Sequence, residues 1–266
     1  MSNVFGPVPS RRLGRSLGID PVPLKTCNWN CVYCQLGRST PVVHERSELI
    51  PRASIIADFD RWLAANDDAS IDWVTFVGSG ETTLHPGLGW LIREVKRRTE
   101  RPVAVITNGS LLWDAAVREE LLAADAVLPS LDAGTSELYR RINRPHPALT
   151  FERHVEGLAT FAEAYTGRLW LEVMLMDGWN DDERSLADLA EVIDRIKPDE
   201  AHLVTPTRPA AEDSAWAPSE ARIARALAVL GAVARVAPPP PTGFGSASET
   251  ADAADLRESL LEEIGE

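Results

Sequence analysis

The chain has 266 residues, a formal net charge of -13, and ordinary shares of hydrophobic (44%) and charged (25%) residues. A chain of this length can bury one sizeable core, so we expect one main domain. No apolar run approaches the roughly 18 residues that span a bilayer, and residues 1–20 hold no apolar segment of secretory type, so we expect a cytoplasmic protein.

Short runs rich in valine and isoleucine alternate with stretches whose apolar residues recur every three or four positions. This is the pattern of βα units, which predicts a parallel sheet flanked by helices. Periodicity alone leaves a doubly wound open sheet and a partial barrel as alternatives. The predicted strands are 17–20, 73–78, 103–107, 126–130, 169–175 and 202–205, and the predicted helices run through 55–63, 88–95, 186–196 and 218–230, the last with Ser219 as N-cap.

The composition changes after residue 235. The stretch "VAPPPPTGFGSASET" contains four prolines and two glycines, which disfavour a continuous helix or strand. We therefore expect a core domain over 1–235 and a linker over 236–248. An acidic helix or tail is predicted over 249–266, with seven acidic residues and one basic residue.

All three cysteines lie in one short stretch, "CNWNCVYC", at Cys27, Cys31 and Cys34. An odd number of clustered thiols does not form a disulfide framework, which indicates a reducing compartment. Three interpretations fit the spacing. The thiolates bind an iron-sulfur cluster with one iron left open, or a zinc ion whose fourth ligand would have to come from a residue such as His44, or they are inert buried thiols.

Glycines and polar side chains follow the predicted strands. "GSGE" (78–81) comes after the second strand, where glycines let the backbone approach a ligand and present carbonyl groups to it. "TNGS" and "SLD" place Asn108, Ser130 and Asp132 after the third and fourth strands. Binding residues gather at this edge in barrels, although turn formation and capping explain the same residue types.

Several charged residues are further candidates. Glu172 lies in the apolar strand "LWLEVML", where an inward carboxylate is costly without a partner, so it either contacts a ligand or faces outward. Arg141, Arg144 and Arg208 either bind an anionic group or form surface ion pairs. We interpret His202 as a structural residue.

The charge is unevenly distributed. Residues 1–50 carry six basic and three acidic side chains, which leaves -16 on the rest of the chain. The acidic body argues against a broad nucleic-acid-binding face, because phosphate contacts need concentrated Lys and Arg. A local anion site and a few solvated arginines both fit the basic segment, which includes Arg11, Arg12 and Arg15.

Cys27, Cys31 and Cys34 stand at the three-then-two intervals that mark the radical S-adenosylmethionine (SAM) superfamily, with Tyr33 in the aromatic place before the last cysteine. The stretch "GPVPSRRLGRSLGIDPVPLKTCNWNCVYCQLG" resembles the opening of a subgroup of iron-sulfur oxidoreductases related to wyosine base synthetases. The resemblance continues through "GSGETTLHP", "TNGSLL", "LDAGTSELYRRINRP", "GWNDDE" and "TPTRP", and so covers roughly residues 5–210.

This resemblance implies a partial barrel of about six βα units, a (β/α)6 TIM-like barrel of the radical SAM type. It implies one 4Fe-4S cluster on the three cysteines, whose open iron binds the amino and carboxylate groups of SAM. A low-potential donor such as flavodoxin or ferredoxin would supply the electron that cleaves SAM. The resulting 5'-deoxyadenosyl radical would abstract hydrogen from an unidentified substrate.

The resemblance also assigns roles to single residues. "GSGE" resembles the GGE motif of the superfamily, with Ser79 in place of a glycine and Thr82 in place of the usual proline. It implies that the SAM amino group is recognised at this motif. The implied cofactor-binding residues are Tyr33, Gly78, Ser79, Gly80, Glu81, Asn108, Ser130 and Asp132, and Glu172, Arg141 and Arg208 are the candidate catalytic residues.

Two alternative functions are considered. A wyosine-type enzyme that modifies tRNA is disfavoured by the acidic body. Such synthetases resemble one another in having a second cysteine cluster, which this sequence lacks. A non-catalytic iron-sulfur or zinc protein would need neither "GSGE" nor the polar strand ends. We therefore expect an enzyme.

Overall fold

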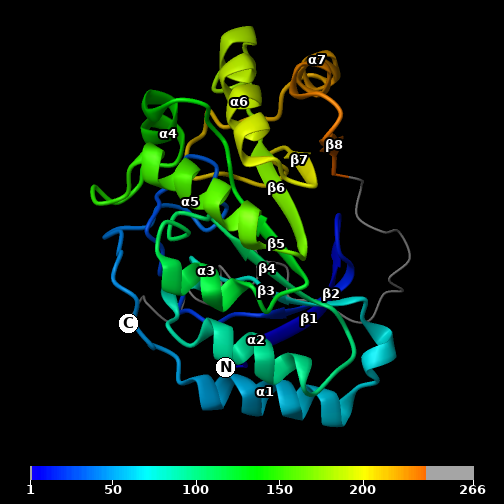
Figure 1. Cartoon of the computed structure of the whole chain (residues 1–266). Helices are drawn as coiled ribbons and strands as arrows, with labels where there is room; N and C mark the ends of the chain where they lie inside the picture. Colours follow the sequence, from blue (N-terminus) through cyan, green and yellow to red (C-terminus); the bar gives the residue numbers. More distant parts are fainter. Residues whose placement is uncertain (1, 238–266) are drawn as a thin grey trace.

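The computed structural model describes residues 2–237, so the predicted tail and nearly all of the predicted linker lie outside the described residues. Eight strands form one sheet whose order follows the chain (Figure 1). They are β1 (Val4–Ser10), β2 (Gly14–Ile19), β3 (Trp73–Phe76), β4 (Val103–Thr107), β5 (Ala126–Pro129), β6 (Arg168–Met174), β7 (Glu200–Val204) and β8 (Ala234–Val236).

Helices fill most of the connections between the parallel strands. In Figure 1 they follow an arc from α1 at the bottom to α6 and α7 at the top. They are α1 (Arg52–Ala65), α2 (Leu88–Lys96), α3 (Ala115–Leu121), α4 (Ser136–Ile142), α5 (Phe151–Ala164), α6 (Glu183–Ile196) and α7 (Glu220–Leu230), with short 3-10 turns η1 (Asp68–Ser70) and η2 (Thr82–Leu84).

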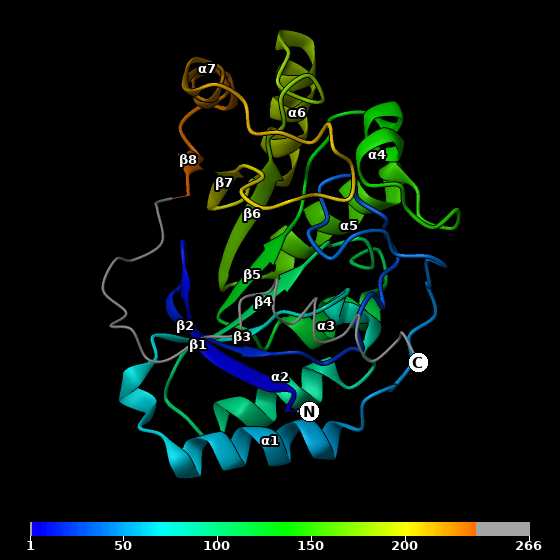
Figure 2. The ribbon, with the colours of Figure 1, turned by 180° about the vertical axis from the view of Figure 1, so that it is seen from behind.

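The strand order makes this sheet a partial barrel. From β2 to β8 every neighbouring pair is parallel, and the order never reverses. Right-handed connections between consecutive strands place their helices on one side of the sheet, so the sheet curves with its other face inward. Figure 2 shows the same curve from behind, and no pairing joins β1 to β8 among the described residues. The predicted parallel α/β partial barrel is confirmed, and the doubly wound alternative is wrong.

Alternating strand residues pack on the two faces. Outward side chains such as Leu17, Val74 and Leu171 join the large core beneath the helices. A second, small cluster lies on the inward face, where Leu13 packs with residues of β4 and β5, namely Ala104, Ala126 and Leu128, and with the partly buried Trp73, Ile106 and Trp170. Leu13 comes from the turn between β1 and β2, so this turn closes the inward face beside the strand starts.

The sequence patterns miss β1 and β8. Strand β1 pairs antiparallel with β2 and contains Pro7 and Pro9. Proline lacks the N–H that a central strand needs, and β1 tolerates it because it lies at the edge of the sheet. Strand β8 has only three residues, too few to show a period, and it extends to Val236, one residue beyond the predicted boundary of the core.

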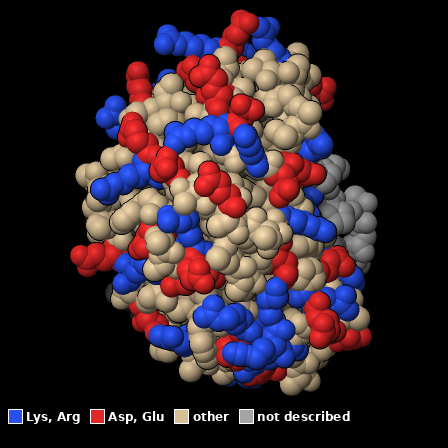
Figure 3. Space-filling model, viewed as in Figure 1, with Lys and Arg blue, Asp and Glu red and all other residues tan. Residues whose placement is uncertain are grey.

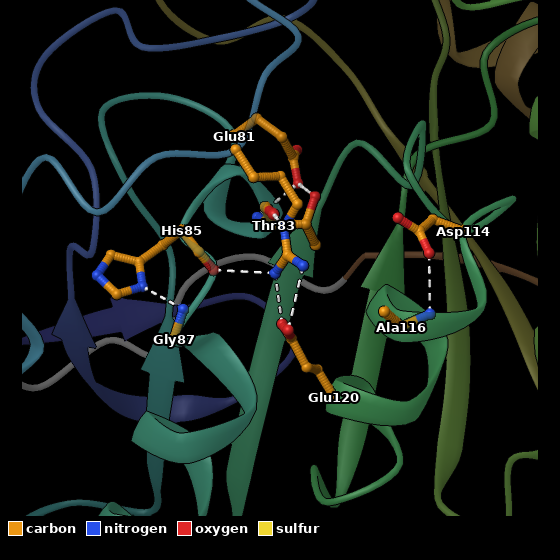
Figure 4. A network of polar contacts seen from close by, with 8 residues as sticks. Glu81, Thr83, His85, Gly87, Asp114, Ala116 and Glu120 are labelled. Carbon is orange, nitrogen blue, oxygen red and sulfur yellow. Dashed lines mark hydrogen bonds and ion pairs between the residues drawn. The ribbon is translucent and has the colours of Figure 1, made fainter.

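All four predicted helices are present, and Ser219 caps α7 by accepting a hydrogen bond from the N–H of Arg222. Helices α3, α4 and α5 were not predicted, although Asp114, Thr135 and Thr150 are their N-caps. Figure 4 shows the first of these caps at Asp114. No helix within residues 2–237 combines the length and apolar character needed to cross a membrane.

Candidate functional site

The cysteine loop, residues 24–38, follows β2 at the carboxyl edge of the sheet. Its middle pairs with the segment after α4, because Trp29 bridges to Pro145 and the N–H of Val32 donates to the carbonyl of Ile142 at 2.9 Å. That segment includes Arg144 at φ 45°, a left-handed conformation that is uncommon for residues other than glycine. The segment at the end of α4 therefore supports the cysteine loop through backbone contacts.

The three cysteines are free and half-buried. Burial, followed by the negative charge of Glu81, raises the pKa of Cys27 to about 12. Burial is also the main cause of the raised pKa of Cys31, to which the charges of the other two cysteines add. Burial raises the pKa of Cys34, against the opposing charge of Lys25. All three thiols therefore belong to one loop and share a buried environment.

The arrangement of these thiols tests which metal group they fit. Within residues 2–237, no three His, Cys, Asp or Glu side chains converge tightly enough for a single metal ion. Zinc needs all its ligands within about 2.0–2.3 Å, whereas the cysteines of a 4Fe-4S cluster bind different irons and stand further apart. His44 packs against His146, with ring centroids 4.6 Å apart. Three thiol donors in one loop are the ligand type of an iron-sulfur cluster, whereas a structural zinc site would need a fourth protein ligand.

The "GSGE" segment follows β3 and lies directly against the cysteine loop. The N–H of Lys25 donates to the carbonyl of Ser79 at 2.5 Å, and the N–H of Glu81 donates to the carbonyl of Thr26 at 2.8 Å. A Cβ atom on Gly80 would lie 2.0 Å from that same Thr26 carbonyl oxygen. Glycine is required here because the two backbones approach too closely for a side chain.

Asp20 is a site residue that sequence reasoning missed. Its carboxylate accepts hydrogen bonds from the N–H groups of Ser79 (2.8 Å) and Val22 (3.2 Å). A Cβ on Gly78 would lie 2.1 Å from its Oδ1 atom. Burial raises the pKa of Asp20, against these hydrogen bonds. Its position just after β2, in "GIDP", was the signal that it lies at the carboxyl edge.

The Glu81 carboxylate is 2% exposed and accepts four hydrogen bonds from the chain itself. Its Oε1 atom accepts from the N–H and hydroxyl of Thr83 and from the hydroxyl of Thr107, and its Oε2 atom accepts from the N–H of Asn108 at 2.6 Å. Figure 4 shows Glu81 beside Thr83. The carboxylate joins the ends of β3 and β4.

Asn108, whose N–H donates to Glu81, connects the end of β4 to the cysteine loop. Its Nδ2 atom donates to Oδ1 of Asn28 at 2.7 Å and lies 3.9 Å from Sγ of Cys27. Asn28, which is fully buried, donates in turn to the hydroxyl of Ser110 at 2.8 Å. The "TNGS" turn after β4 is therefore bonded to the loop between the first two cysteines.

The side chains of Tyr33 and Asp132 are hydrogen-bonded to each other. The Tyr33 hydroxyl donates to Oδ2 of Asp132 at 2.7 Å, as does Nδ2 of Asn143 at 2.6 Å, and the N–H of Met174 donates to Oδ1 at 2.8 Å. Burial raises the pKa of Asp132 to about 6 despite these donors. Nδ2 of Asn143 also lies 3.8 Å from Sγ of Cys31. Sequence reasoning missed Asn143, which stands in the "INRP" stretch.

Glu172 faces inward, since its strand neighbours Leu171 and Val173 belong to the core under the helices. Its Oε1 atom lies 2.5 Å from Nη2 of Arg12, and both side chains are largely buried. Ser130 bridges to Glu172 across the neighbouring strands. The alternative of an outward Glu172 is wrong, and the inward carboxylate has the partner that its burial requires.

The two candidate catalytic arginines lie at the rim. Arg141 places its guanidinium 4.8 Å from the ring centre of Trp179 and donates to the carbonyl of Gly178. Arg208 is exposed and donates to Oε1 of Gln35, the residue after Cys34, at 3.3 Å. No hydrogen bond or ion pair found within residues 2–237 joins either arginine to another predicted site residue. A surface hollow of about 580 Å³ lies elsewhere, lined by Trp113, Arg153 and Arg195 among others.

Fold and site together define an open parallel α/β barrel with three free thiols at the carboxyl edge of its strands. The model of the radical SAM superfamily matches residues 22–190. The chain therefore belongs to the radical SAM superfamily. Membership implies radical chemistry that depends on SAM, a 4Fe-4S cluster, a reductant and a substrate.

The chain is also similar to individual proteins. The chain is 37% identical over 230 residues to a UPF0026 protein of Methanocaldococcus jannaschii, covering 86% of this chain and 71% of that one. It is 43% identical over 223 residues to a protein of Brachyspira hyodysenteriae named GTPase Obg, covering 84% of this chain but only 32% of that protein. The solved structure of TYW1 with a lysine-pyruvate adduct bound has a similar fold, with a TM-score of 0.59, 19% identity and coverage of 82% and 74%.

Proposed function

We propose that the protein binds one 4Fe-4S cluster through Cys27, Cys31 and Cys34 and is a radical SAM enzyme. The observation that carries this proposal is the presence of three free, half-buried cysteines in one loop at the carboxyl edge of the barrel. When bound, the cluster and SAM supply a 5'-deoxyadenosyl radical that abstracts hydrogen from the substrate.

The chain's own residues would hold and shield these groups. The carbonyl of Ser79 accepts from the N–H of Lys25 in the cysteine loop, and the carbonyls of Gly78, Ser79 and Gly80 are the proposed acceptors for the ammonium group of SAM. Asn108 and Ser130 stand at the ends of β4 and β5 as the proposed contacts to the rest of SAM. The sequence-based expectation was that Glu81, Tyr33 and Asp132 contact SAM directly. Their side chains instead form hydrogen bonds within the chain, and we propose that they position the loops around the cofactor.

Substrate roles for Glu172, Arg141 and Arg208 are part of the same proposal. Glu172 faces the barrel interior, whereas the two arginines would act only at the rim, where a substrate enters. We further propose a cytoplasmic location, a catalytic domain over 1–235, a linker over 236–248 and an acidic tail over 249–266. A relation to wyosine base synthetases rests on the sequence motifs, since 19% identity to TYW1 supports the fold alone.

Metal analysis tests the ligand assignment. The protein is reconstituted without oxygen and its iron, sulfide and zinc contents are measured for the wild type and for Cys27→Ala, Cys31→Ala and Cys34→Ala. We expect about four irons per chain in the wild type and loss of the visible charge-transfer absorption in each variant. His44→Ala is the matched control and should keep the cluster. Zinc bound in equal amount to the chain, and lost in His44→Ala, would contradict the proposal.

A further inference from the structure

The segment that follows the cysteine loop, residues 39–50, runs without helix or strand toward α1. Backbone hydrogen bonds attach this connecting segment to the site. The N–H of Val43 donates to the carbonyl of Cys27 at 3.0 Å. The N–H of Ser47 donates to the carbonyl of Leu84, in η2, at 3.0 Å. The connecting segment therefore joins the first cysteine to the turn that follows the "GSGE" motif.

Arg46 lies in the middle of this connecting segment, with its side chain only 18% exposed. Its Nε atom donates to the carbonyl of Thr83 at 2.8 Å, and its Nη2 atom donates to the carbonyl of His85 at 3.1 Å. Its Nη1 and Nη2 atoms also donate to the carboxylate of Glu120 in α3, at 3.1 Å and 2.5 Å. Figure 4 labels these three partners, Thr83, His85 and Glu120. One guanidinium thus ties the connecting segment to η2 and to α3.

Glu120 gives Arg46 a firmly placed anchor. Gly89 of α2 packs so closely on this residue that a Cβ atom added to Gly89 would lie 2.8 Å from Cβ of Glu120. The planar guanidinium presents five donors in a fork, so it can bridge a carboxylate and two carbonyls at once. The ammonium group of a lysine does not offer this geometry.

Thr83, whose carbonyl Arg46 holds, is also a partner of Glu81. The N–H and the hydroxyl of Thr83 donate to Oε1 of Glu81, at 2.9 Å and 2.5 Å. The other carboxylate oxygen of Glu81 accepts from the N–H of Asn108, whose side chain donates to Asn28 between the first two cysteines. The placement of Thr83 therefore bears on the "GSGE" turn, the end of β4 and the cysteine loop together.

We propose that Arg46 is a positioning residue for SAM binding, which holds Thr83 and thereby fixes Glu81 and the turn 78–81 against the cysteine loop. The side-chain hydrogen bonds of Arg46 found within residues 2–237 go to Thr83, His85 and Glu120, so it acts on the motif through its neighbours. The effect on SAM rests on the proposed function, whereas the hold on Glu81 does not.

Hydrogen exchange tests the hold on Glu81 without SAM. The N–H groups of Thr83 and Asn108 are both bonded to this carboxylate, so their exchange rates report whether it stays in place. Exchange is measured by mass spectrometry on the reconstituted protein without oxygen, in fragments that cover these two amides. In Arg46→Met we expect both to exchange about tenfold faster, which corresponds to the loss of roughly one hydrogen bond. Unchanged exchange would overturn the inference.

SAM affinity tests the consequence for the cofactor. SAM is titrated into the reduced, reconstituted protein, and the change in the electron paramagnetic resonance spectrum of the cluster gives Kd. We expect Kd to rise by about tenfold or more in Arg46→Met, as is typical when a group that orients a metal site is removed. Arg46→Lys keeps the charge and a single donor group, so its Kd should rise less. A Kd in Arg46→Met equal to that of the wild type would overturn the inference.

Arg98→Met is the matched control. Arg98 also joins carboxylates from two helices, Asp60 of α1 and Glu94 of α2, but its bonds do not reach η2 or the cysteine loop. This variant should change neither the exchange of Thr83 and Asn108 nor the Kd of SAM. Equal effects in Arg46→Met and Arg98→Met would assign them to a general loss of stability and overturn the positioning role.

The two measurements separate this inference from the proposed function. A wild type with a complete cluster that binds no SAM would contradict the proposed function, and exchange in Arg46→Met would then decide the hold on Glu81 by itself. If the wild type binds SAM and Arg46→Met binds it equally well, the positioning role fails alone.

Discussion

At the scale of residues, the carboxylates expected at the cofactor serve mainly to hold the site together. Asp132 accepts from Tyr33, Asn143 and Met174, and Glu81 accepts from both neighbouring strand ends. The sequence showed that these carboxylates stand at strand ends. It did not show that each would find its donors within the chain, because those donors are brought close only by folding.

Asp132→Asn tests this supporting role. An amide at this position places an NH2 group against Asn143 or Met174, both of which donate, so one buried hydrogen bond is lost. We expect the free energy of unfolding of the apoprotein to fall by about 1–3 kcal/mol, measured by urea denaturation. Asp67→Asn is the control, because Asn also caps the exposed 3-10 turn that Asp67 begins. Equal stability of both variants would contradict a supporting role for Asp132.

Burial of His154 makes the free energy of unfolding depend on pH. It is buried against Trp29 and Tyr139, and this burial lowers its pKa from 6.5 to about 4. The unfolded chain therefore binds a proton at a higher pH than the folded chain does, so stability falls as pH decreases from about 6.5 toward about 4. The shift to about 4 corresponds to at most about 3 kcal/mol.

Comparison with His154→Gln isolates this contribution from that of other groups. The difference in unfolding free energy between the wild type and this variant should shrink as the pH is lowered through that window. A difference that stays constant with pH would contradict a depressed pKa for His154.

At the scale of elements, the parallel units were predictable and the β1–β2 hairpin was not. The strands β3 to β7 are short apolar runs, and in the helices α1, α2, α6 and α7 apolar residues recur every three or four positions. Strand β1 contains two prolines, and its partner β2 begins with residues that look like a polar turn. The position of Leu13 against β4 and β5 depends on contacts distant in sequence, which no local pattern records.

Leu13→Ala tests whether the hairpin turn closes the barrel interior. Leu13 is 1% exposed, so truncation should leave a cavity beside Ala104 and Ala126 and lower the free energy of unfolding by about 2–5 kcal/mol. Leu49→Ala is the matched control, because Leu49 is 56% exposed. Urea denaturation measures both variants. If the two substitutions have similarly small effects, the turn does not pack into the barrel as described.

At the scale of the whole molecule, a net charge of -13 coexists with basic side chains around the cysteine loop. On the face seen in Figure 3, acidic and basic side chains are intermixed. Lys25 lies near Cys34 and Arg208 contacts Gln35, so the rim beside the last cysteine is basic. If an acidic electron carrier such as flavodoxin is the reductant, we expect it to dock at this rim.

Charge reversal tests this docking face. The double variant Lys25→Glu with Arg208→Glu should be reduced by flavodoxin several-fold more slowly than the wild type at low salt, and should lose most of the salt dependence. Arg93→Glu on α2 is the control and changes the net charge at an exposed position on a helix outside the cysteine loop. Stopped-flow absorbance of the cluster follows the reduction. Equal slowing by the control would assign the effect to net charge instead of to this rim.

The most direct test of the central claim is the reductive cleavage of SAM. The protein is reconstituted without oxygen, its iron and sulfide are counted, and 5'-deoxyadenosine is quantified after addition of dithionite and SAM. We predict that the wild type forms 5'-deoxyadenosine and methionine and that Cys31→Ala forms neither. A wild-type protein with a complete cluster that neither binds SAM nor forms 5'-deoxyadenosine would contradict the account.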